Sequence, residues 1–325
     1  MKALICGVGG QDGAYLSQLL LDKGYEVVGA SRDAMTSTFF NLKRLGIRDR
    51  VTTTSMAITD FRSVLQTLDR FQPDEIYNLA GQSSVGLSFE QPVETMESIA
   101  IGTLNMLEAI SFYGKPIRFY NAGSSECFGD TGAAVASEET PFKPRSPYAV
   151  AKATAHNLVA NYREAYSLYA CTGILFNHES PLRPERFVTQ KIVRTAARIA
   201  AGGDGKLEMG NIDIQRDWGW APEYVEAMWK ILQIDRPQDF VIATGRTVSL
   251  EFFIEQAFGF FGLNYRDYLV VNRNYFRPTD IHIGAANPAK ANEVLGWRAQ
   301  VQIEAVIEKM CVAARDLVQI QGSAA

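Results

Sequence analysis

The chain has 325 residues, of which 47% are hydrophobic and 21% charged, and its formal net charge is −4. This composition is typical of a soluble globular protein and excludes disordered, collagen-like and disulfide-rich classes. An acidic balance offers no basic surface for nucleic acid, and no apolar run approaches the ~20 residues of a membrane-spanning helix. The cysteines stand far apart without a CxxC pair, which predicts buried thiols in a reducing compartment: Cys6, Cys127, Cys171 and Cys311. We therefore expect a cytoplasmic globular enzyme without nucleic-acid or membrane partners.

Strand-like and helix-like segments alternate through the first half of the chain. Short apolar runs predict strands at residues 3–6, 25–30, 51–54, 75–79, 117–121 and 170–176. Helical spacing predicts helices at residues 13–23, 61–71, 93–113 and 147–167, the last with Pro147 in its first turn and Ser146 as its cap. This alternation indicates an α/β protein with a Rossmann-like, doubly wound parallel sheet.

The alternation loosens after Phe176. We expect a loop at residues 177–186, a turn at 202–205, short helices at 222–232, 249–261 and 303–317, and one strand at 240–243. This pattern predicts a smaller mixed C-terminal region that packs against the sheet and is intertwined with it. We therefore divide the chain into residues 1–176 and residues 177–325.

Three glycines, Gly7, Gly10 and Gly13, separate the first predicted strand from its helix. A turn without Cβ atoms lets the backbone approach a pyrophosphate at the helix N-terminus, so the spacing predicts dinucleotide binding. A glycine-rich turn without a ligand is the alternative, and the position of the glycines in the first βαβ unit argues against it.

The residues after the second strand select between NAD and NADP in folds of this kind. Here that strand ends in Ser31-Arg32-Asp33. A guanidinium matches phosphate geometry, so Arg32 favours the 2′-phosphate of NADP, whereas Asp33 would repel that phosphate. We expect NADP, with NAD not excluded and a solvated surface arginine as the alternative for Arg32.

Tyr148 and Lys152 lie four residues apart on one face of the predicted helix at 147–167. A tyrosine has a pKa near ~10 and is a poor base at neutral pH, but a neighbouring ammonium and a nicotinamide's charge stabilise its phenolate. We interpret the pair as a general base that takes a proton from a sugar hydroxyl. An ordinary exposed Tyr/Lys pair is the alternative.

Ser124, Ser125 and Glu126 follow the strand at 117–121, where ligands gather in open parallel sheets. Either serine orients a substrate hydroxyl or merely caps a turn. A carboxylate at this edge is unfavourable unless it is solvated or used. We therefore interpret Glu126 as a general base for a carbon acid, with a rim glutamate paired to an arginine as the alternative.

These motifs converge on a family. The sequence closely resembles the GDP-mannose 4,6-dehydratases, of the extended short-chain dehydrogenase/reductase superfamily, over almost its whole length. The generic part of the likeness is GVGGQDGAYL (7–16) and PRSPYAVAK (144–152). AGSSECFG (122–129) also matches, and the far more specific stretches are GILFNHESP (173–181) and RDWGWAPEYVEAMW (216–229). The resemblance implies an NADP-binding Rossmann part at residues 1–176 and a mainly nucleotide-sugar-binding part at residues 177–325.

Residue roles follow from the resemblance by position. It implies a catalytic set of Ser124, Glu126, Tyr148 and Lys152. It implies cofactor contacts at Gly7, Gly10, Gln11, Asp12, Gly13, Arg32, Leu79, Gln82, Tyr148, Lys152, His178 and Arg183. It implies GDP-sugar contacts at Ser83, Asn177, Lys191, Gly210, Arg216 and Arg277. For His178 the alternative is a buried histidine satisfied by backbone, and the lack of further histidines at ligand spacing argues against a metal.

The resemblance implies an internal redox cycle that converts a GDP-sugar to its 4-keto-6-deoxy derivative. Tyr148, with its pKa lowered by Lys152, would take the C4 hydroxyl proton while Ser124 orients the hydroxyl. Glu126 would remove the C5 proton and assist the loss of water from C6. A nucleotide-sugar 4-epimerase, a 4-keto-6-deoxy-sugar reductase and, from another class, a non-catalytic NADP-binding regulator stay open as alternatives.

Four positions depart from the family pattern. Ser124 stands where threonine is usual, Asp33 where a second arginine is usual, Ala57 where an acid is usual, and Ser84 where histidine is usual. Ser124 keeps the hydroxyl, whereas the other changes suggest an offshoot that acts on GDP-manno-heptose in capsule or lipopolysaccharide synthesis. The resemblance also implies a homodimer or homotetramer, with a loop near residues 36–41 that reaches a neighbouring subunit.

Overall fold

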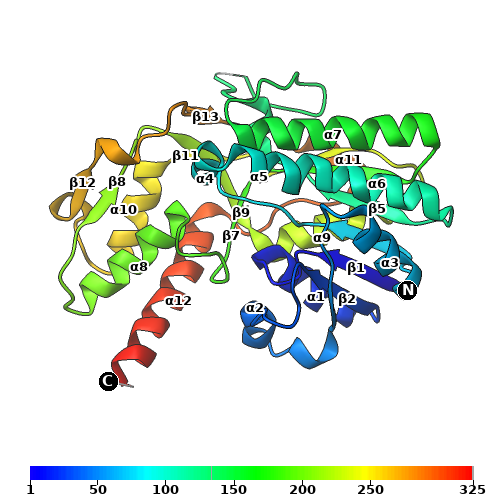
Figure 1. The fold of residues 1–325 in the computed structure, drawn as a ribbon. Helices are drawn as coiled ribbons and strands as arrows, with labels where there is room; N and C mark the ends of the chain where they lie inside the picture. Colours follow the sequence, from blue (N-terminus) through cyan, green and yellow to red (C-terminus); the bar gives the residue numbers. More distant parts are fainter. Residues whose placement is uncertain (133, 324–325) are drawn as a thin grey trace.

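A parallel seven-stranded sheet forms the centre of the structure, a computed structural model that describes residues 1–132 and 134–323 (Figure 1). Its strands are β1 (Lys2–Cys6), β2 (Glu26–Ser31), β3 (Thr52–Ser55), β4 (Glu75–Asn78), β5 (Arg118–Ala122), β6 (Ala170–Leu175) and β10 (Phe240–Ile242). Their order in space is β10-β6-β5-β4-β1-β2-β3. The central strands are almost entirely buried, as expected where helices cover both faces of a parallel sheet. The predicted Rossmann-like fold is confirmed.

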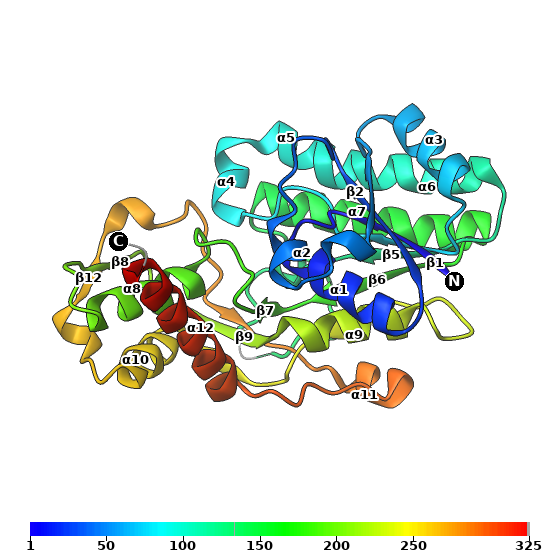
Figure 2. The same ribbon diagram turned by 90° about the horizontal axis from the view of Figure 1, so that it is seen from below.

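Helices cover both faces of this sheet (Figure 2). On one face lie α3 (Phe61–Phe71), α6 (Gly102–Tyr113) and α7 (Pro147–Tyr166), and on the other lie α1 (Gln11–Asp22) and α9 (Ala221–Ile231). As predicted, α7 begins with Pro147 after Ser146, whose hydroxyl accepts a hydrogen bond from the Ala149 amide (3.1 Å). This start fixes the first turn of α7, which carries Tyr148.

The C-terminal part has an apolar cluster of its own. It is built around α8 (Val188–Ala200), α10 (Leu250–Phe260) and α12 (Ile303–Ser323), which pack together. Short strands complete it: β7 (Asn177–Glu179), β8 (Leu207–Met209), β9 (Gln215–Trp220), β11 (Thr247–Ser249), β12 (Leu269–Val271) and β13 (Ile283–Gly284). Between these elements the chain returns to the sheet, where β10 pairs with β6 and α9 packs on α1.

Several predicted elements of the second half are wrong. The expected loop at 177–186 begins with β7, which pairs in parallel with β9 over Asn177–Glu179. The strand expected at 240–243 is present as β10, but it is one of several strands in the second half. The others are short and pair with each other, so the sequence around each of them gives no clear strand pattern. The helix α8 was not predicted, and α12 continues to Ser323 instead of ending near residue 317.

Other differences lie at helix boundaries in the first half. The expected helix at 93–113 consists of α5 (Pro92–Met96), one wider turn at Glu97–Ile101 and α6. Short helices that were not predicted are α2 (Phe40–Arg44) and α4 (Val85–Glu90), joined in the second half by α11 (Ala289–Leu295). In the described ranges, no helix is long and apolar enough to cross a membrane.

The strand order places a ligand site. From β1 the chain moves outward to β2 and β3, then returns to β4 on the other side of β1. In open parallel sheets, ligands bind at the carboxyl ends of the strands where the order reverses in this way. The loops after β1, β4 and β5, which carry Gly7–Gly10, Leu79–Ser84 and Gly123–Ser124, all open at this edge.

Candidate active site

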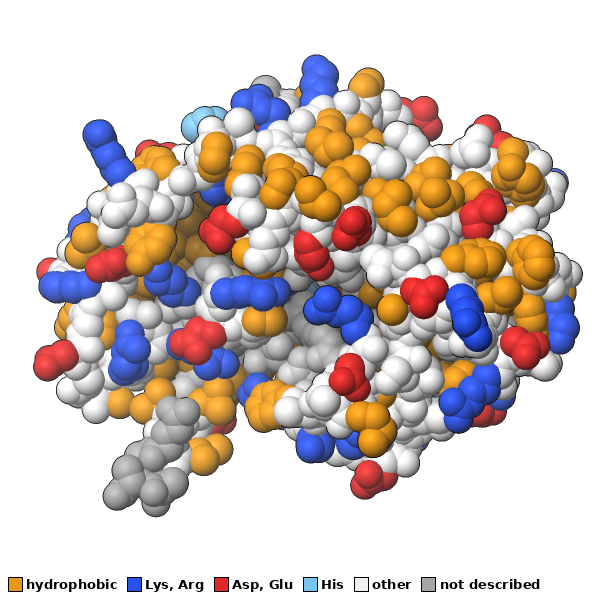
Figure 3. Space-filling model, viewed as in Figure 1, with side chains coloured by type: hydrophobic (Ala, Val, Ile, Leu, Met, Phe, Trp, Pro, Cys, Tyr) orange, Lys and Arg blue, Asp and Glu red, His pale blue; other side chains and the backbone are white. Residues whose placement is uncertain are grey.

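A cleft of about 1110 Å³ lies at this edge, between the sheet and the C-terminal part. Figure 3 shows the hollow, with Lys and Arg side chains along it and Asp and Glu side chains above them. Every residue singled out from the sequence as catalytic, cofactor-binding or substrate-binding lines this cleft. The structure therefore brings together residues from Gly7 to Arg277, although their individual roles stay predictions.

The glycine loop is shaped by close backbone packing. Gly7 has a φ of +84°, and a Cβ there would lie 2.9 Å from the Leu79 carbonyl oxygen. At Gly13 a Cβ would lie 2.5 Å from the Gly7 carbonyl oxygen. Gly10 is the N-cap residue of α1 and has no side chain that could accept a hydrogen bond from the helix. The first amides of this helix therefore remain available to an anion.

His178 is held by two acceptors of the protein. Its Nδ1 lies 2.8 Å from the Phe176 carbonyl oxygen, and its Nε2 lies 3.0 Å from Asp12 Oδ2. A carbonyl and a carboxylate only accept, so this arrangement favours a proton on both ring nitrogens. Burial alone would lower the pKa of His178, but the charge and hydrogen bond of Asp12 raise it above its ordinary value. Both ring nitrogens therefore have partners within the protein, and one of these partners is a backbone carbonyl, as in the alternative of a buried histidine satisfied by backbone.

Further bonds tie this histidine segment to α1. The Gln11 side-chain amide donates to the His178 carbonyl oxygen (3.2 Å), and the Ser180 hydroxyl donates to Gln11 Oε1 (2.7 Å). Arg183 also donates to the His178 carbonyl oxygen (3.0 Å) and pairs with Glu179 (3.1 Å). The glycine loop and β7, far apart in sequence, therefore form one rigid wall of the cleft.

Tyr148 and Lys152 lie at the floor, each with 9% of its surface exposed. Burial raises the pKa of Tyr148 above its usual range, and the hydrogen bond with Ser124 and the charge of Arg183 act against this rise. Lys152 Nζ donates to the Ala122 carbonyl oxygen (2.7 Å) and stands 5.8 Å from the centre of the Tyr148 ring. Burial lowers the pKa of Lys152 to about 8. The expected lowering of the Tyr148 pKa by Lys152 stays a prediction.

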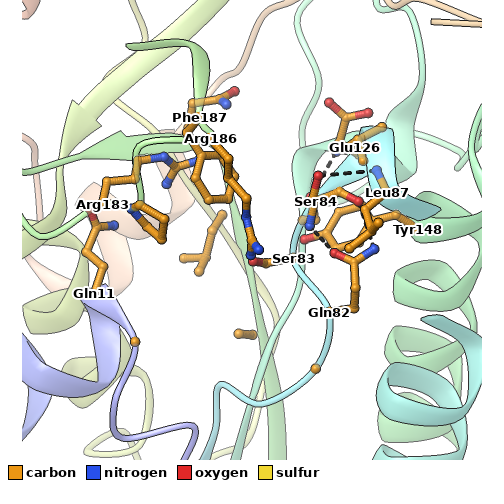
Figure 4. Close-up of a pocket in the computed structure, with 18 of the residues that line it drawn as sticks. Gln11, Gln82, Ser83, Ser84, Leu87, Glu126, Tyr148, Arg183, Arg186 and Phe187 are labelled. Carbon is orange, nitrogen blue, oxygen red and sulfur yellow. Dashed lines mark hydrogen bonds between the residues drawn. The ribbon is translucent and has the colours of Figure 1, made fainter. Parts of the chain in front are cut away.

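Glu126 stands beside this pair (Figure 4). It follows Ser124, whose hydroxyl caps the short helix Ser125–Phe128 by accepting from the Glu126 amide (3.3 Å). The carboxylate is half-buried and lines the cleft. Burial lowers the pKa of Arg216, and the charge of Glu126 nearby acts against this lowering. In Figure 4, Ser84 and Gln82 lie on the same side, where the Gln82 side-chain amide donates to the Ser84 carbonyl oxygen (2.8 Å).

Basic residues gather on the C-terminal side of the cleft. Arg216 is 6% exposed, and its guanidinium donates to the Gln215 carbonyl oxygen (2.9 Å). Lys191 stands over the Tyr275 ring at 4.4 Å, and a Cβ at Gly210 would lie 2.6 Å from the Tyr275 carbonyl oxygen. Arg277 also lines the cleft and, unlike Arg216, is exposed. Such a wall suits a diphosphate.

The two charged residues after β2 differ in their relation to the cleft. Arg32 is exposed and lines the cleft, whereas Asp33 does not line it. Asp33 Oδ1 instead accepts from the Met35 and Thr36 amides (2.9 and 3.2 Å). The Thr36 side chain, together with these two amides, lowers the pKa of Asp33, and its carboxylate faces its own loop.

The cleft also holds charged residues that were missed from the sequence, among them Arg186 and Glu94. Arg186 projects into the cleft from the segment after β7 and forms no ion pair among the described residues (Figure 4). Glu94 lines the opposite wall on α5. A charged residue on a loop or a short helix is ordinarily solvated, so neither carried a local signal.

A family model described as GDP-mannose 4,6 dehydratase matches residues 4–310. The chain belongs to this family. GDP-mannose 4,6 dehydratase 1 of Arabidopsis thaliana is 46% identical over 321 residues, which span 95% of this chain and 88% of the relative. GDP-mannose 4,6-dehydratase of Sinorhizobium fredii is 46% identical over 328 residues, 93% of each protein. The protein of that name from Vibrio cholerae is 42% identical over 343 residues, 95% of this chain and 92% of the relative.

Solved structures share the fold at low identity. UDP-glucose 4-epimerase of Thermus thermophilus, solved with NAD, has a TM-score of 0.84 at 24% identity and covers 97% of this chain and 99% of its own. RMD of Pseudomonas aeruginosa, solved with NADPH, has a TM-score of 0.80 at 21% identity and covers 97% and 99%. These likenesses establish the extended Rossmann architecture and nothing finer. Among the described residues, no group of acids, histidines or cysteines is placed to hold a metal.

Proposed function

We propose that this protein is a GDP-mannose 4,6-dehydratase, which removes water from a GDP-sugar to give the 4-keto-6-deoxy product. The observation that carries the proposal is the placement of Glu126 beside Ser124, Tyr148 and Lys152 in one cleft. Oxidation of a sugar alcohol needs a base at one hydroxyl only, whereas dehydration needs a second group for the C–H proton and the leaving hydroxyl. Membership in the family supports the same reaction.

The cleft fits a nicotinamide dinucleotide. The glycine turn leaves room for a pyrophosphate at the uncapped start of α1, with the imidazolium of His178 and Arg183 nearby to balance its charge. Arg32 is free to meet a 2′-phosphate while Asp33 is engaged in its own turn, so we propose NADP. The bound nicotinamide would accept hydride from the sugar and return it at the end of the cycle.

The residues at the floor handle the first proton. The Tyr148 phenolate takes the proton of the C4 hydroxyl, and the Ser124 hydroxyl, which is hydrogen-bonded to Tyr148, holds that substrate group in place. Because burial raises the pKa of Tyr148, the protein needs positive charge to form the phenolate. Lys152, fixed by the Ala122 carbonyl oxygen, supplies part of it.

Glu126 handles the elimination. A ketone at C4 acidifies the C5 hydrogen, and the Glu126 carboxylate removes this proton. The same carboxyl then protonates the C6 hydroxyl, which leaves as water, so no second acid is required. The half-buried position of Glu126 beside the cleft gives it access to both atoms once the diphosphate is held near Arg216 and Lys191.

The experiment is mass spectrometry of the purified protein with GDP-mannose and, separately, with GDP-manno-heptose. The wild type is expected to remove one water, and Glu126→Gln is expected to bind the GDP-sugar without removing it. Exposed Glu90→Gln is the matched control. If neither substrate loses water after addition of NADP⁺, the proposed dehydratase activity is refuted. An epimerised or reduced product would identify the rival reaction.

Further properties belong to the same proposal. We propose that residues 1–176 mainly bind the cofactor and residues 177–325 mainly bind the nucleotide sugar. Four free, buried thiols are consistent with the cytoplasm. We also propose a homodimer or homotetramer and a role in deoxysugar synthesis for surface polysaccharides, with the mass-spectrometric comparison deciding between hexose and heptose.

A further inference from the structure

One wall of the cleft is a helical face that the proposed mechanism does not use. The helix α5 continues directly into the wider turn Glu97–Ile101. The side chains of this stretch that line the cleft are spaced three or four residues apart: Gln91, Glu94, Glu97 and Ser98. The wall is joined to the loop after β4, because the Gln82 side-chain amide donates to Thr95 Oγ1 (3.2 Å).

Glu94 is the unusual member of this face. Its Oε2 atom is buried, yet it accepts no hydrogen bond, and it is the one carboxylate oxygen in that condition among the described residues. No ion pair involving Glu94 occurs among them either. A buried acceptor without a donor is unfavourable in the free protein. A ligand that donates a hydrogen bond to Glu94 therefore binds more tightly, because it supplies the missing interaction.

The charge of the cleft indicates what that donor is. A phosphate would be repelled by Glu94 and attracted by the opposite side, where Arg183 and Arg186 lie in Figure 4. The group at Glu94 is therefore not a phosphate, and it carries a hydrogen-bond donor. Of the parts of a GDP-sugar that reach Tyr148 and Glu126, the hydroxyls of the sugar meet this description.

We propose that the Glu94 carboxylate binds a sugar hydroxyl that does not react, and so determines which sugar the cleft accepts. The inference rests on the proposed function and extends it to a specificity-determining residue. Met96, two residues further along α5, packs against the cluster that contains Tyr148, so a sugar held at Glu94 is oriented relative to the catalytic base.

The test uses the full-length Glu94→Ala and Glu94→Gln variants, with Glu90→Gln as control because Glu90 is exposed and does not line the cleft. Glu94→Ala is expected to raise KM for GDP-mannose about 10- to 100-fold, the factor for one hydrogen bond to a charged group. Glu94→Gln keeps one acceptor and is expected to raise KM less. The Kd for GDP, which lacks the sugar, should stay within about two-fold.

Thermal unfolding separates this role from a structural one. Because Oε2 lacks a partner, the Tm of Glu94→Ala should be equal to or above that of the wild type. An unchanged KM, a parallel loss of GDP and GDP-mannose affinity, or a lowered Tm restored by Glu94→Gln would overturn the inference. If the wild type removes no water, the proposed function fails by itself. In that case the affinity for GDP-mannose relative to GDP, measured by calorimetry, still decides the role of Glu94.

Discussion

Asp217, in the family's RDWG stretch, is a buried carboxyl group behind the cleft, and its protonation can be tested quantitatively through the pH dependence of stability. Along β9 the side chains of Arg216 and Trp218 line the cleft, whereas Asp217 points to the other side and is fully buried. Its Oδ1 accepts from the Thr244 amide (3.0 Å), and its Oδ2 accepts from the Gly245 amide (2.7 Å). Asp217 therefore anchors the turn after β10 and fixes the strand that presents Arg216.

Burial outweighs these hydrogen bonds and raises the pKa of Asp217 from 3.8 to about 6. The native protein thus binds a proton that the unfolded chain has released between those two pH values. The contribution of Asp217 to the free energy of unfolding therefore falls as pH rises through this window and is constant above it. A difference of about two pKa units corresponds to about 3 kcal/mol of unfolding free energy.

The perturbation is Asp217→Asn, which cannot titrate, and the assay is urea unfolding at several pH values from 4.5 to 7. The free energy of unfolding of the wild type relative to the variant is expected to fall by about 2 kcal/mol across this range. Asp213→Asn is the control, because Asp213 is exposed four residues earlier and should show no such trend. A difference between wild type and Asp217→Asn that stays constant within about 0.5 kcal/mol would refute the reasoning.

Three further predictions concern the cofactor wall and the base. Gly13→Ala should abolish NADP binding in a fluorescence titration because its Cβ meets backbone, whereas Gly259→Ala, with open space around it, should bind normally. Asp12→Asn removes the partner that raises the pKa of His178, so the titration of this histidine, followed by NMR, should move to lower pH; an unmoved titration would contradict the imidazolium. Tyr148→Phe should lower kcat at least ~100-fold with NADP affinity retained, and near-normal turnover would exclude Tyr148 as the base.

Local patterns were sufficient for the Rossmann part of the fold. The strands there are short buried runs, and some of the helices that follow carry their own start signal, such as Ser146 and Pro147 before α7. The site could be predicted for a related reason, because the glycines, Tyr148 and Glu126 lie in loops or first turns beside these strands. The helix α8 was also within reach, since Ile192, Val193, Ala196 and Ile199 recur at helical spacing and are buried.

The rest depended on contacts between distant residues. That β10 joins the sheet beside β6, and that β7 pairs with β9, follows from packing across long stretches of chain. The same holds for the charge of His178, which Asp12 stabilises from 166 residues away, and for the unpartnered oxygen of Glu94. The sequence by itself determined the sheet strands and main helices of the Rossmann part and which side chains carry chemistry, because those depend on near neighbours. Burial, protonation and hydrogen-bond satisfaction depend on what surrounds a side chain, so only the tertiary structure decided them.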